Sequence, residues 1–273
     1  MKRFSKLFLI SSLLVSLILV GCGNSNTSIN AKDAAPNTAQ TKSSEIIVSA
    51  AASLKDSMTE LQKAYNAKNP NIKLTFNFGA SGTLQQQIEQ GAPADLFISA
   101  GKSQVDTLDQ KNLLVKESIV NLVGNDLVLV AGKDNKDVTT VQDLTKPSVE
   151  KIGIGTPESV PAGKYAQESL TNLKLWDTLN PKFVMAKDVT QVLNYVETGN
   201  VEAGIVYKSD AQGSTKVKVV AAFPADSHKA IVYPAGIVAA TKEKAAAGEF
   251  LKYLQSPEAQ QIFVKYGFSS MTK

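Results

Sequence analysis

The residues best suited to chemistry lie at four places where an expected strand gives way to an expected helix. The junctions are Ala50–Leu54 (AAASL), Gly79–Thr83 (GASGT), Val160–Lys164 (VPAGK) and Lys187–Thr190 (KDVT). A helix start presents backbone N–H groups that have no partner within the helix, and the helix dipole adds partial positive charge there. Four such junctions, built from small or hydroxyl residues, together predict an anion-binding site. At any single junction the alternative is a serine that simply caps a helix.

The rest of the composition limits what else the chain can do. Arg3 is the only arginine, His228 the only histidine and Cys22 the only cysteine. A zinc site made of His and Cys is therefore disfavoured, and an internal disulfide is impossible. The formal charge is +4, and three of the cations (Lys2, Arg3 and Lys6) lie in a segment expected to be removed, which leaves +1. A near-neutral protein has no general electrostatic reason to bind nucleic acid.

The N-terminal region has the pattern of an export segment followed by a tether. Residues 1–21 join a basic start to an apolar run, and Leu19–Cys22 (LVGC) resembles a lipobox, in which the cysteine is lipidated. The alternative is a plain transmembrane helix, but the apolar run is short for a span. Residues 22–44 are polar and predict a flexible tether with a typical span of about 25 Å. We therefore expect a lipid anchor at Cys22, on the extracytoplasmic face of the cell membrane.

Beyond the tether, strand-like and helix-like stretches alternate. The expected strands are residues 45–49, 72–78, 96–99, 127–131, 152–155, 183–185, 204–206, 217–220 and 230–238, and the expected helices include 53–66, 81–90, 242–255 and 257–265. This alternation predicts an α/β fold with mixed, mostly parallel sheets flanked by helices. The length of this region, about 229 residues, favours two lobes over one.

Five stretches carry a resemblance to a known family. They are Ser49–Leu54 (SAAASL), Phe78–Leu84 (FGASGTL), Gly91–Ala100 (GAPADLFISA), Ser159–Ala166 (SVPAGKYA) and Gly204–Tyr207 (GIVY). In this order they resemble the molybdate-binding proteins of ABC transporters, here in a lipoprotein form. The resemblance implies a two-lobed type 2 periplasmic-binding-protein fold with a ligand cleft between the lobes. It divides the chain into lobe I (residues 45–124), lobe II (125–229) and a return to lobe I (230–273).

The resemblance also implies a role for five individual residues. Ser53 and Ser81 match serines that donate through hydroxyl and backbone, Ala162 and Val189 match backbone N–H donors, and Tyr207 matches a tyrosine whose hydroxyl completes the site. Gly82 departs from the pattern, because some family members have a further serine there. The implied ligand is molybdate or tungstate, with no cofactor and no direct metal-ion ligand. The implied partners are a permease and its ATPase, with no nucleic acid, and the protein is expected to be a monomer.

Two other functions remain open at this point. One is a binding protein for another tetrahedral oxyanion, such as sulfate. The other is a secreted hydrolase, in which Ser53 or Ser81 is the nucleophile and His228 its base. Neither serine lies in a G-x-S-x-G motif, and His228 falls in a polar loop where we expect it to be exposed and inert. We therefore expect a binding protein and not an enzyme.

Overall fold

The computed structural model describes residues 43–271, all of which belong to one compact unit, Thr41–Lys273. The predicted export segment, the lipobox with Cys22 and the tether before Ser43 lie outside the described residues. Within the described residues, no helix is long and apolar enough to cross a membrane.

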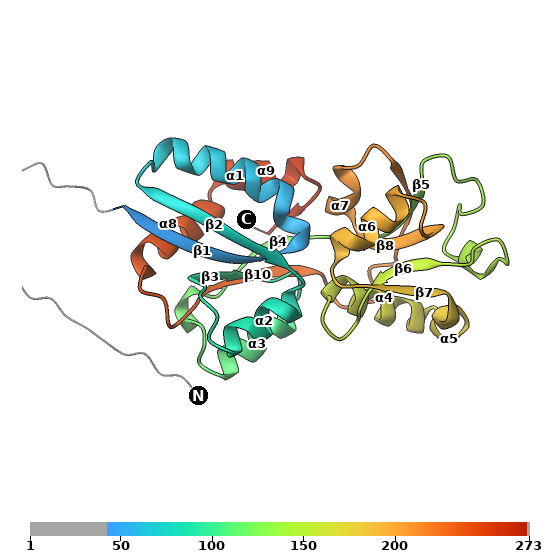
Figure 1. The fold of residues 1–273 in the computed structure, drawn as a ribbon, viewed down its shortest axis with the longest axis horizontal. Helices are drawn as coiled ribbons and strands as arrows, with labels where there is room; N and C mark the ends of the chain where they lie inside the picture. The colour runs from blue at the N-terminus through green and yellow to red at the C-terminus, as the bar shows by residue number, and fades with distance from the viewer. Residues whose placement is uncertain (1–42, 272–273) are drawn as a thin grey trace, which may run out of the picture. The chain divides into compact units, whose positions relative to one another are not determined.

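Residues from both ends of the described chain build a six-stranded sheet. Its strand order is β11-β4-β10-β3-β1-β2, with β1 Ser44–Ala51, β2 Ile72–Gly79, β3 Leu96–Ile98, β4 Val120–Gly124, β10 Val232–Ile237 and β11 Ser269–Ser270. Its helices are α1 Lys55–Lys68, α2 Ser81–Glu89, α3 Lys102–Gln110, α8 Lys244–Leu254 and α9 Pro257–Lys265, with short 3-10 turns at Ala52–Leu54 and Lys116–Ser118. Helices α2 and α3 cover one face, and α1, α8 and α9 cover the other (Figure 1). We call this sheet and its helices the six-stranded half.

The middle of the chain builds a five-stranded sheet. Its order is β7-β6-β8-β5-β9, with β5 Leu127–Gly132, β6 Ile152–Gly155, β7 Phe183–Ala186, β8 Ala203–Tyr207 and β9 Val217–Ala222. Its helices are α4 Pro161–Asn172, α5 Trp176–Leu179, α6 Val189–Glu197 and α7 Lys208–Gln212, with 3-10 turns at Gln142–Thr145 and Asn180–Lys182. Helices α4 and α5 lie on one face, and α6 and α7 on the other (Figure 1). We call this unit the five-stranded half.

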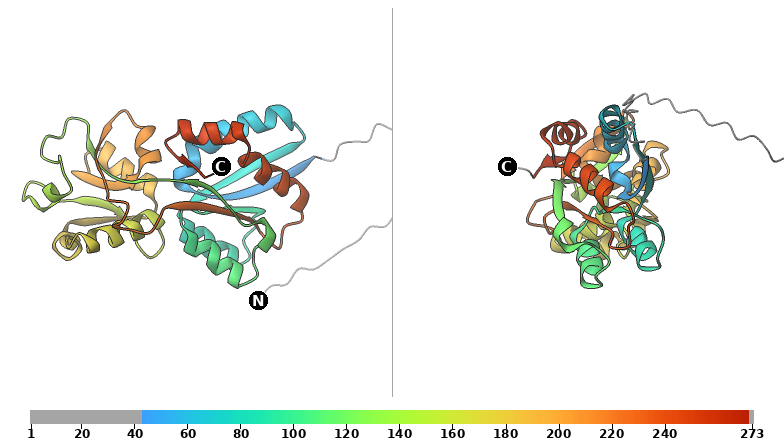
Figure 2. Two further views of the ribbon diagram at one scale, coloured as in Figure 1. Left: turned by 180° about the vertical axis from the view of Figure 1, so that it is seen from behind. Right: turned by 90° about the vertical axis from the view of Figure 1, so that its left-hand side faces the viewer.

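Two connections join the halves (Figure 2). The first is Asn125–Asp126, between β4 and β5, and the second is residues 223–231, between β9 and β10. Both sheets are mixed: of the nine strand pairs in the described part, four are parallel. The α/β class with two mixed sheets is confirmed, although parallel pairs are not the majority. The exact lobe boundaries (45–124, 125–229 and 230–273) stay a prediction.

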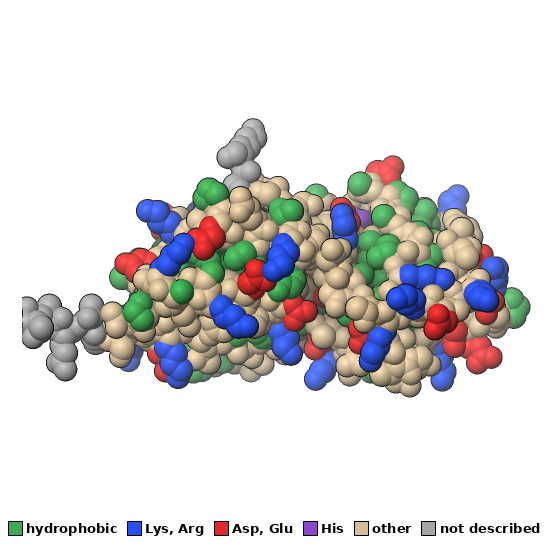
Figure 3. All heavy atoms as spheres, turned by 90° about the horizontal axis from the view of Figure 1, so that it is seen from above, with side chains coloured by type: hydrophobic (Ala, Val, Ile, Leu, Met, Phe, Trp, Pro, Cys, Tyr) green, Lys and Arg blue, Asp and Glu red, His purple; other side chains and the backbone are tan. Residues whose placement is uncertain are grey.

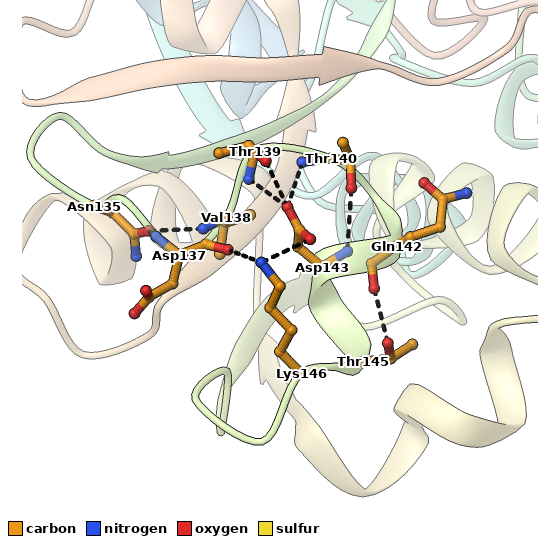
Figure 4. A network of polar contacts seen from close by, with 9 residues as sticks. All are labelled: Asn135, Asp137, Val138, Thr139, Thr140, Gln142, Asp143, Thr145 and Lys146. Carbon is orange, nitrogen blue, oxygen red and sulfur yellow. Dashed lines mark hydrogen bonds and ion pairs between the residues drawn. The ribbon is translucent and has the colours of Figure 1, made fainter.

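The long loop between β5 and β6 is held by a polar network around Asp143 (Figure 4). One oxygen of its carboxylate accepts hydrogen bonds from the N–H and hydroxyl of Thr139 at 2.8 and 2.7 Å and from the N–H of Thr140 at 2.9 Å. The ammonium of Lys146 lies 2.9 Å from its other oxygen. Lys146 and these donors hold the pKa of Asp143 well below its usual range. The carboxylate is therefore a structural anchor of this loop.

Candidate functional site

The five residues predicted to bind the anion surround one small cavity between the two halves. The cavity is small: the centre of a water-sized sphere can occupy about 10 Å³ of it, about the space that a single water molecule needs. Ser53 and Ser81 reach it from the six-stranded half, and Ala162, Val189 and Tyr207 reach it from the five-stranded half. The structure thus brings all five together, although they are spread over 155 positions of sequence. Whether each one contacts a ligand stays a prediction.

On the six-stranded half, both serines follow parallel strands that end at the cavity. Ser53 lies in the 3-10 turn Ala52–Leu54 after β1, and its Oγ is 2.9 Å from the Oη of Tyr233. Ser81 is the first residue of α2 and is buried. Its Oγ accepts a hydrogen bond of 2.9 Å from the N–H of Ala100. Because this lone pair is occupied, the Ser81 hydroxyl proton remains free to be donated.

On the five-stranded half, two helix starts face the cavity. Helix α4 begins at Pro161, so Ala162 lies in its first turn, where backbone N–H groups have no helical partner. Gly163 makes this start possible, since a Cβ on it would lie 1.9 Å from the carbonyl oxygen of Gly155. Helix α6 begins at Val189, and Asp188 caps it by accepting a 2.8 Å hydrogen bond from the N–H of Gln191. Both starts therefore present main-chain donors.

Tyr207 lies at the end of β8 and is buried. Burial raises the pKa of its hydroxyl well above the usual value, so the group stays protonated and can donate. Its Oη donates to the carbonyl oxygen of Ala100 at 3.3 Å, across the boundary between the halves. This bond is long for an O–H donor, whose usual distance is about 2.7–2.8 Å. The hydroxyl can therefore turn towards an acceptor in the cavity at little cost.

The two halves also meet directly beside the cavity, at Gly82. Its N–H donates to the carbonyl oxygen of Ser159 at 2.9 Å, so a backbone hydrogen bond joins the halves. A Cβ on Gly82 would lie 2.6 Å from that oxygen and 2.9 Å from the Cα of Ser159. The departure from the family pattern at this position therefore has a structural reason. Glycine allows the two backbones to touch.

Comparison with known proteins decides the family. A model described as "Bacterial extracellular solute-binding protein" matches residues 46–269. This chain belongs to that family. It is a solute-binding protein and not an enzyme, and its place of action is extracellular.

Individual relatives narrow the likeness. The chain is 46% identical, over 98% of its length and 99% of the relative's, to a putative ABC transporter substrate-binding lipoprotein, YvgL of Bacillus subtilis. It is 43% identical to the molybdate-binding protein ModA of Haemophilus influenzae, over 84% of this chain and 91% of the relative. Among solved structures, the periplasmic molybdate-binding protein of Azotobacter vinelandii matches with a TM-score of 0.75 and 26% identity, over 82% of this chain and 98% of that one.

The hydrolase arrangement is contradicted by the geometry of this solute-binding protein. His228 does not line the cavity. Its Nδ1 lies 2.8 Å from the carbonyl oxygen of Lys229, and its ring packs 5.8 Å from that of Tyr165, so it is only half-exposed. Neither Ser53 nor Ser81 has a histidine partner within the described residues. A serine nucleophile would need such a base within hydrogen-bond reach.

No lysine lines the cavity within the described part of the chain, so positive charge there comes from helix starts alone. Asp188 is the one charged side chain of the lining, and its carboxylate serves as the cap of α6. On the face of the molecule in Figure 3, Lys and acidic side chains are interspersed, with no broad field of one sign. Residues 43–271 contain no cluster of His, Cys, Asp and Glu that could hold a metal ion.

Sequence reasoning missed three residues that stand behind Ser53. Tyr233 on β10, Asn125 between the sheets and Ser209 on α7 are all buried and form a hydrogen-bonded network with it. They are 180, 72 and 156 positions away from Ser53 in the sequence. The one available signal was Asn125 itself, a polar residue at the predicted boundary between lobe I and lobe II. Nothing in the strand pattern around Tyr233 indicated a polar role.

Proposed function

We propose that this solute-binding protein captures molybdate in the cavity between its halves and delivers it to an ABC transporter. The observation that carries the proposal is the meeting of five predicted donors, from four strand-to-helix junctions and one strand end, around a single cavity. The 43% identical relative, which is named for molybdate binding, supports the choice of ligand. In this arrangement Ser53, Ser81 and Tyr207 donate from hydroxyls, and Ala162 and Val189 donate from backbone N–H groups.

A site made only of donors selects its anion by protonation state. A buried dianion must recover the hydrogen bonds that it loses with water. Molybdate and tungstate are fully deprotonated near neutral pH and can accept from every side. Monoprotonated phosphate would place its own proton against a donor and leave both unpaired. Sulfate has the right charge but is smaller, so a shell sized for molybdate would hold it loosely, whereas tungstate should bind about as well as molybdate.

Binding would also stabilise contact between the halves. An anion that accepts from both halves favours the state in which they touch, as the Gly82–Ser159 hydrogen bond shows them touching here. We infer that the permease recognises this joined form, with its ATPase driving transport. The protein would act as a monomer, and lobe I (45–124 and 230–273) and lobe II (125–229) would move as the two rigid parts.

We propose that lipid on Cys22 holds the protein on the extracytoplasmic face of the cell membrane. The lipobox motif and the 46% identical relative named as a lipoprotein support this. The tether of residues 22–44 would keep the binding unit within reach of the permease. Radioactive palmitate labelling of the whole chain, lost in Cys22→Ala, would test the anchor. Labelling that persists in the variant would place the lipid elsewhere.

Calorimetry with molybdate, tungstate, sulfate and phosphate tests the ligand. We expect tight binding of the first two, weak binding of sulfate and none of phosphate. A double variant, Ser53→Ala with Ser81→Ala, should lose most of the molybdate affinity if binding occurs in this cavity. Tight sulfate binding without molybdate binding would overturn the ligand, and full molybdate affinity in the double variant would overturn the site.

A further inference from the structure

A buried chain of hydrogen bonds runs from the first connection between the halves to Ser53. The Nδ2 of Asn125 lies 2.8 Å from the Oγ of Ser209 and 3.2 Å from the Oη of Tyr233. The Oη of Tyr233 in turn lies 2.9 Å from the Oγ of Ser53. Tyr233 is fully buried, so each of its polar atoms needs a protein partner.

The direction of this chain follows from the amide of Asn125. Its Oδ1 accepts hydrogen bonds from the backbone N–H of Asp126 at 2.9 Å and of Ser209 at 3.4 Å. A backbone N–H can only donate, so the atom facing these two groups must be the amide oxygen. The atom facing Tyr233 is then the NH₂ group, which can only donate. The Oη of Tyr233 is therefore an acceptor from Asn125.

The proton of Tyr233 has one remaining destination in this network. Burial raises the pKa of this hydroxyl well above its usual value, so the proton is retained. Its other partner is the Oγ of Ser53, and a fully buried hydroxyl proton without an acceptor would be costly. Tyr233 therefore donates to Ser53. The proton of Ser53 is then left to point into the cavity.

Ser81 shows the same arrangement with a different partner. There the N–H of Ala100 occupies the Oγ lone pair, and the Ser81 proton is free for the cavity. Each serine thus accepts a hydrogen bond from a group behind it, and its own proton is left for the cavity. In one case that group is main chain and cannot be removed. In the other it is the side chain of Tyr233, which can.

We propose that Tyr233, oriented by Asn125, is a positioning residue that fixes Ser53 as a hydrogen-bond donor and so excludes protonated oxyanions from the cavity. Without this donor, the Ser53 oxygen could accept the proton of a ligand such as monohydrogen phosphate. The inference rests on the proposed function, and specifically on Ser53 as a ligand residue. It explains how a serine, whose hydroxyl can both donate and accept, can distinguish a deprotonated oxyanion from a protonated one.

The experiment compares the full chain with Tyr233→Phe, using molybdate and inorganic phosphate as probes near pH 7. Phosphate keeps at least one proton at this pH. In the variant we expect the Kd for molybdate to rise about tenfold, because Ser53 no longer has a fixed donor role. Phosphate, which the wild type is expected not to bind, should become a detectable ligand of the variant, so that the ratio of the two Kd values narrows by about tenfold or more.

Two further variants separate positioning from packing. Tyr253→Phe is the matched control, since the Tyr253 hydroxyl is buried without a partner in the described part and lies away from the cavity. It should leave both affinities unchanged. Asn125→Ala should narrow the ratio of the phosphate and molybdate Kd values as Tyr233→Phe does, but by less. Without Asn125, the Tyr233 hydroxyl can either donate to Ser53 or accept from it. The two changes should combine to less than their sum, since they act through one chain.

The outcomes are distinct. If wild-type protein binds molybdate and Tyr233→Phe weakens molybdate and phosphate in equal proportion, Tyr233 merely packs and the inference is wrong. It is equally wrong if the variant binds molybdate as wild type does, or if phosphate binding stays undetectable while molybdate weakens. If wild-type protein does not bind molybdate at all, the proposed function fails instead.

Discussion

The two walls of the cavity present hydrogen-bond donors in different ways. The six-stranded half offers two serine hydroxyls, each held by a donor behind it: Tyr233 for Ser53 and the Ala100 N–H for Ser81. The five-stranded half offers the starts of α4 and α6 and the hydroxyl of Tyr207. Side-chain donors can be altered one at a time, whereas a main-chain donor changes only when its helix moves. The serines of the first wall are thus open to tuning, as is Tyr207, whereas the helix starts of the second wall are fixed by packing.

The largest effect is expected where the fixed wall is forced to move. In Gly163→Ala, the new Cβ would lie 1.9 Å from the Gly155 carbonyl oxygen, so α4 must shift away from β6. We expect the free energy of unfolding to fall by about 3 kcal/mol or more, at the upper end of overpacking costs, with loss of molybdate binding. Urea unfolding followed by circular dichroism measures the first and calorimetry the second.

A matched glycine gives the control for this change. In Gly248→Ala on α8, the Cβ would meet its nearest neighbour, the Cδ1 of Ile237, at an ordinary 3.9 Å. A helical glycine replaced by alanine should then raise stability by about 0.5–1 kcal/mol. If Gly163→Ala and Gly248→Ala change the free energy of unfolding and the molybdate affinity equally, the close approach of α4 to β6 does not position the start of α4.

The next effect concerns the line where the walls meet. In Gly82→Ala, the methyl group would press on the Ser159 backbone only when the halves touch. We expect molybdate binding to weaken by about 1–3 kcal/mol while the ligand-free protein keeps its stability, because alanine is a good helix former. Calorimetry and urea unfolding give the two numbers. Unchanged affinity would mean that the halves bind the anion without the Gly82–Ser159 contact.

The two serines should differ from each other, although both stand on the tunable wall. Ser53→Ala and Ser81→Ala should each weaken molybdate binding by about 1–3 kcal/mol. Each change also leaves one buried donor without its acceptor: the N–H of Ala100 in Ser81→Ala and the hydroxyl of Tyr233 in Ser53→Ala. Ser81→Ala should cost more, because Ser81 is buried whereas Ser53 is half-exposed. Calorimetry measures which variant loses more molybdate affinity. Wild-type affinity in both variants would mean that neither serine belongs to the site.

The same contrast explains what the sequence could predict. Side-chain donors could be predicted because the residue type itself shows the donor when it falls in a family motif. This applies to Ser53, Ser81 and Tyr207. Ala162 and Val189 were predictable only through the resemblance, since any residue supplies a backbone N–H. Tyr233 was missed because its role depends on a neighbour 180 positions away.

The fold shows a similar division. The alternating pattern predicted most strands and helices, with α2 expected at 81–90 and found at Ser81–Glu89. Strand β4 was not predicted: it is short, and its two neighbours are the late strands β10 and β11. The late antiparallel pairs that make both sheets mixed depend on such long-range pairing. Local pattern identifies elements, whereas their partners are set by packing.

The smallest effect is expected from an acidic pair that spans the two walls. Asp210, on α7 of the five-stranded half, is half-buried, and its burial raises its pKa to about 7, helped by the negative charges of Asp56 and Asp188. Asp56 belongs to α1 of the six-stranded half. Between about pH 4 and pH 7 the folded protein therefore binds more protons than the unfolded chain, and the free energy of unfolding falls as pH rises through this window.

Asp210→Asn should remove that part of the slope while keeping an oxygen to accept the 3.0 Å hydrogen bond from the Tyr207 N–H. The slope of the free energy of unfolding against pH should change by less than about 1.4 kcal/mol per pH unit, because Asp210 is only half-buried. Urea unfolding at several pH values measures it. Asp143→Asn is the opposite control: its carboxyl has a lowered pKa, so its stabilisation is present at neutral pH and lost in acid. If the free energy of unfolding of Asp210→Asn depends on pH as it does in the wild type, the charge of Asp210 does not affect how the two walls meet. Donor geometry alone would then govern their contact.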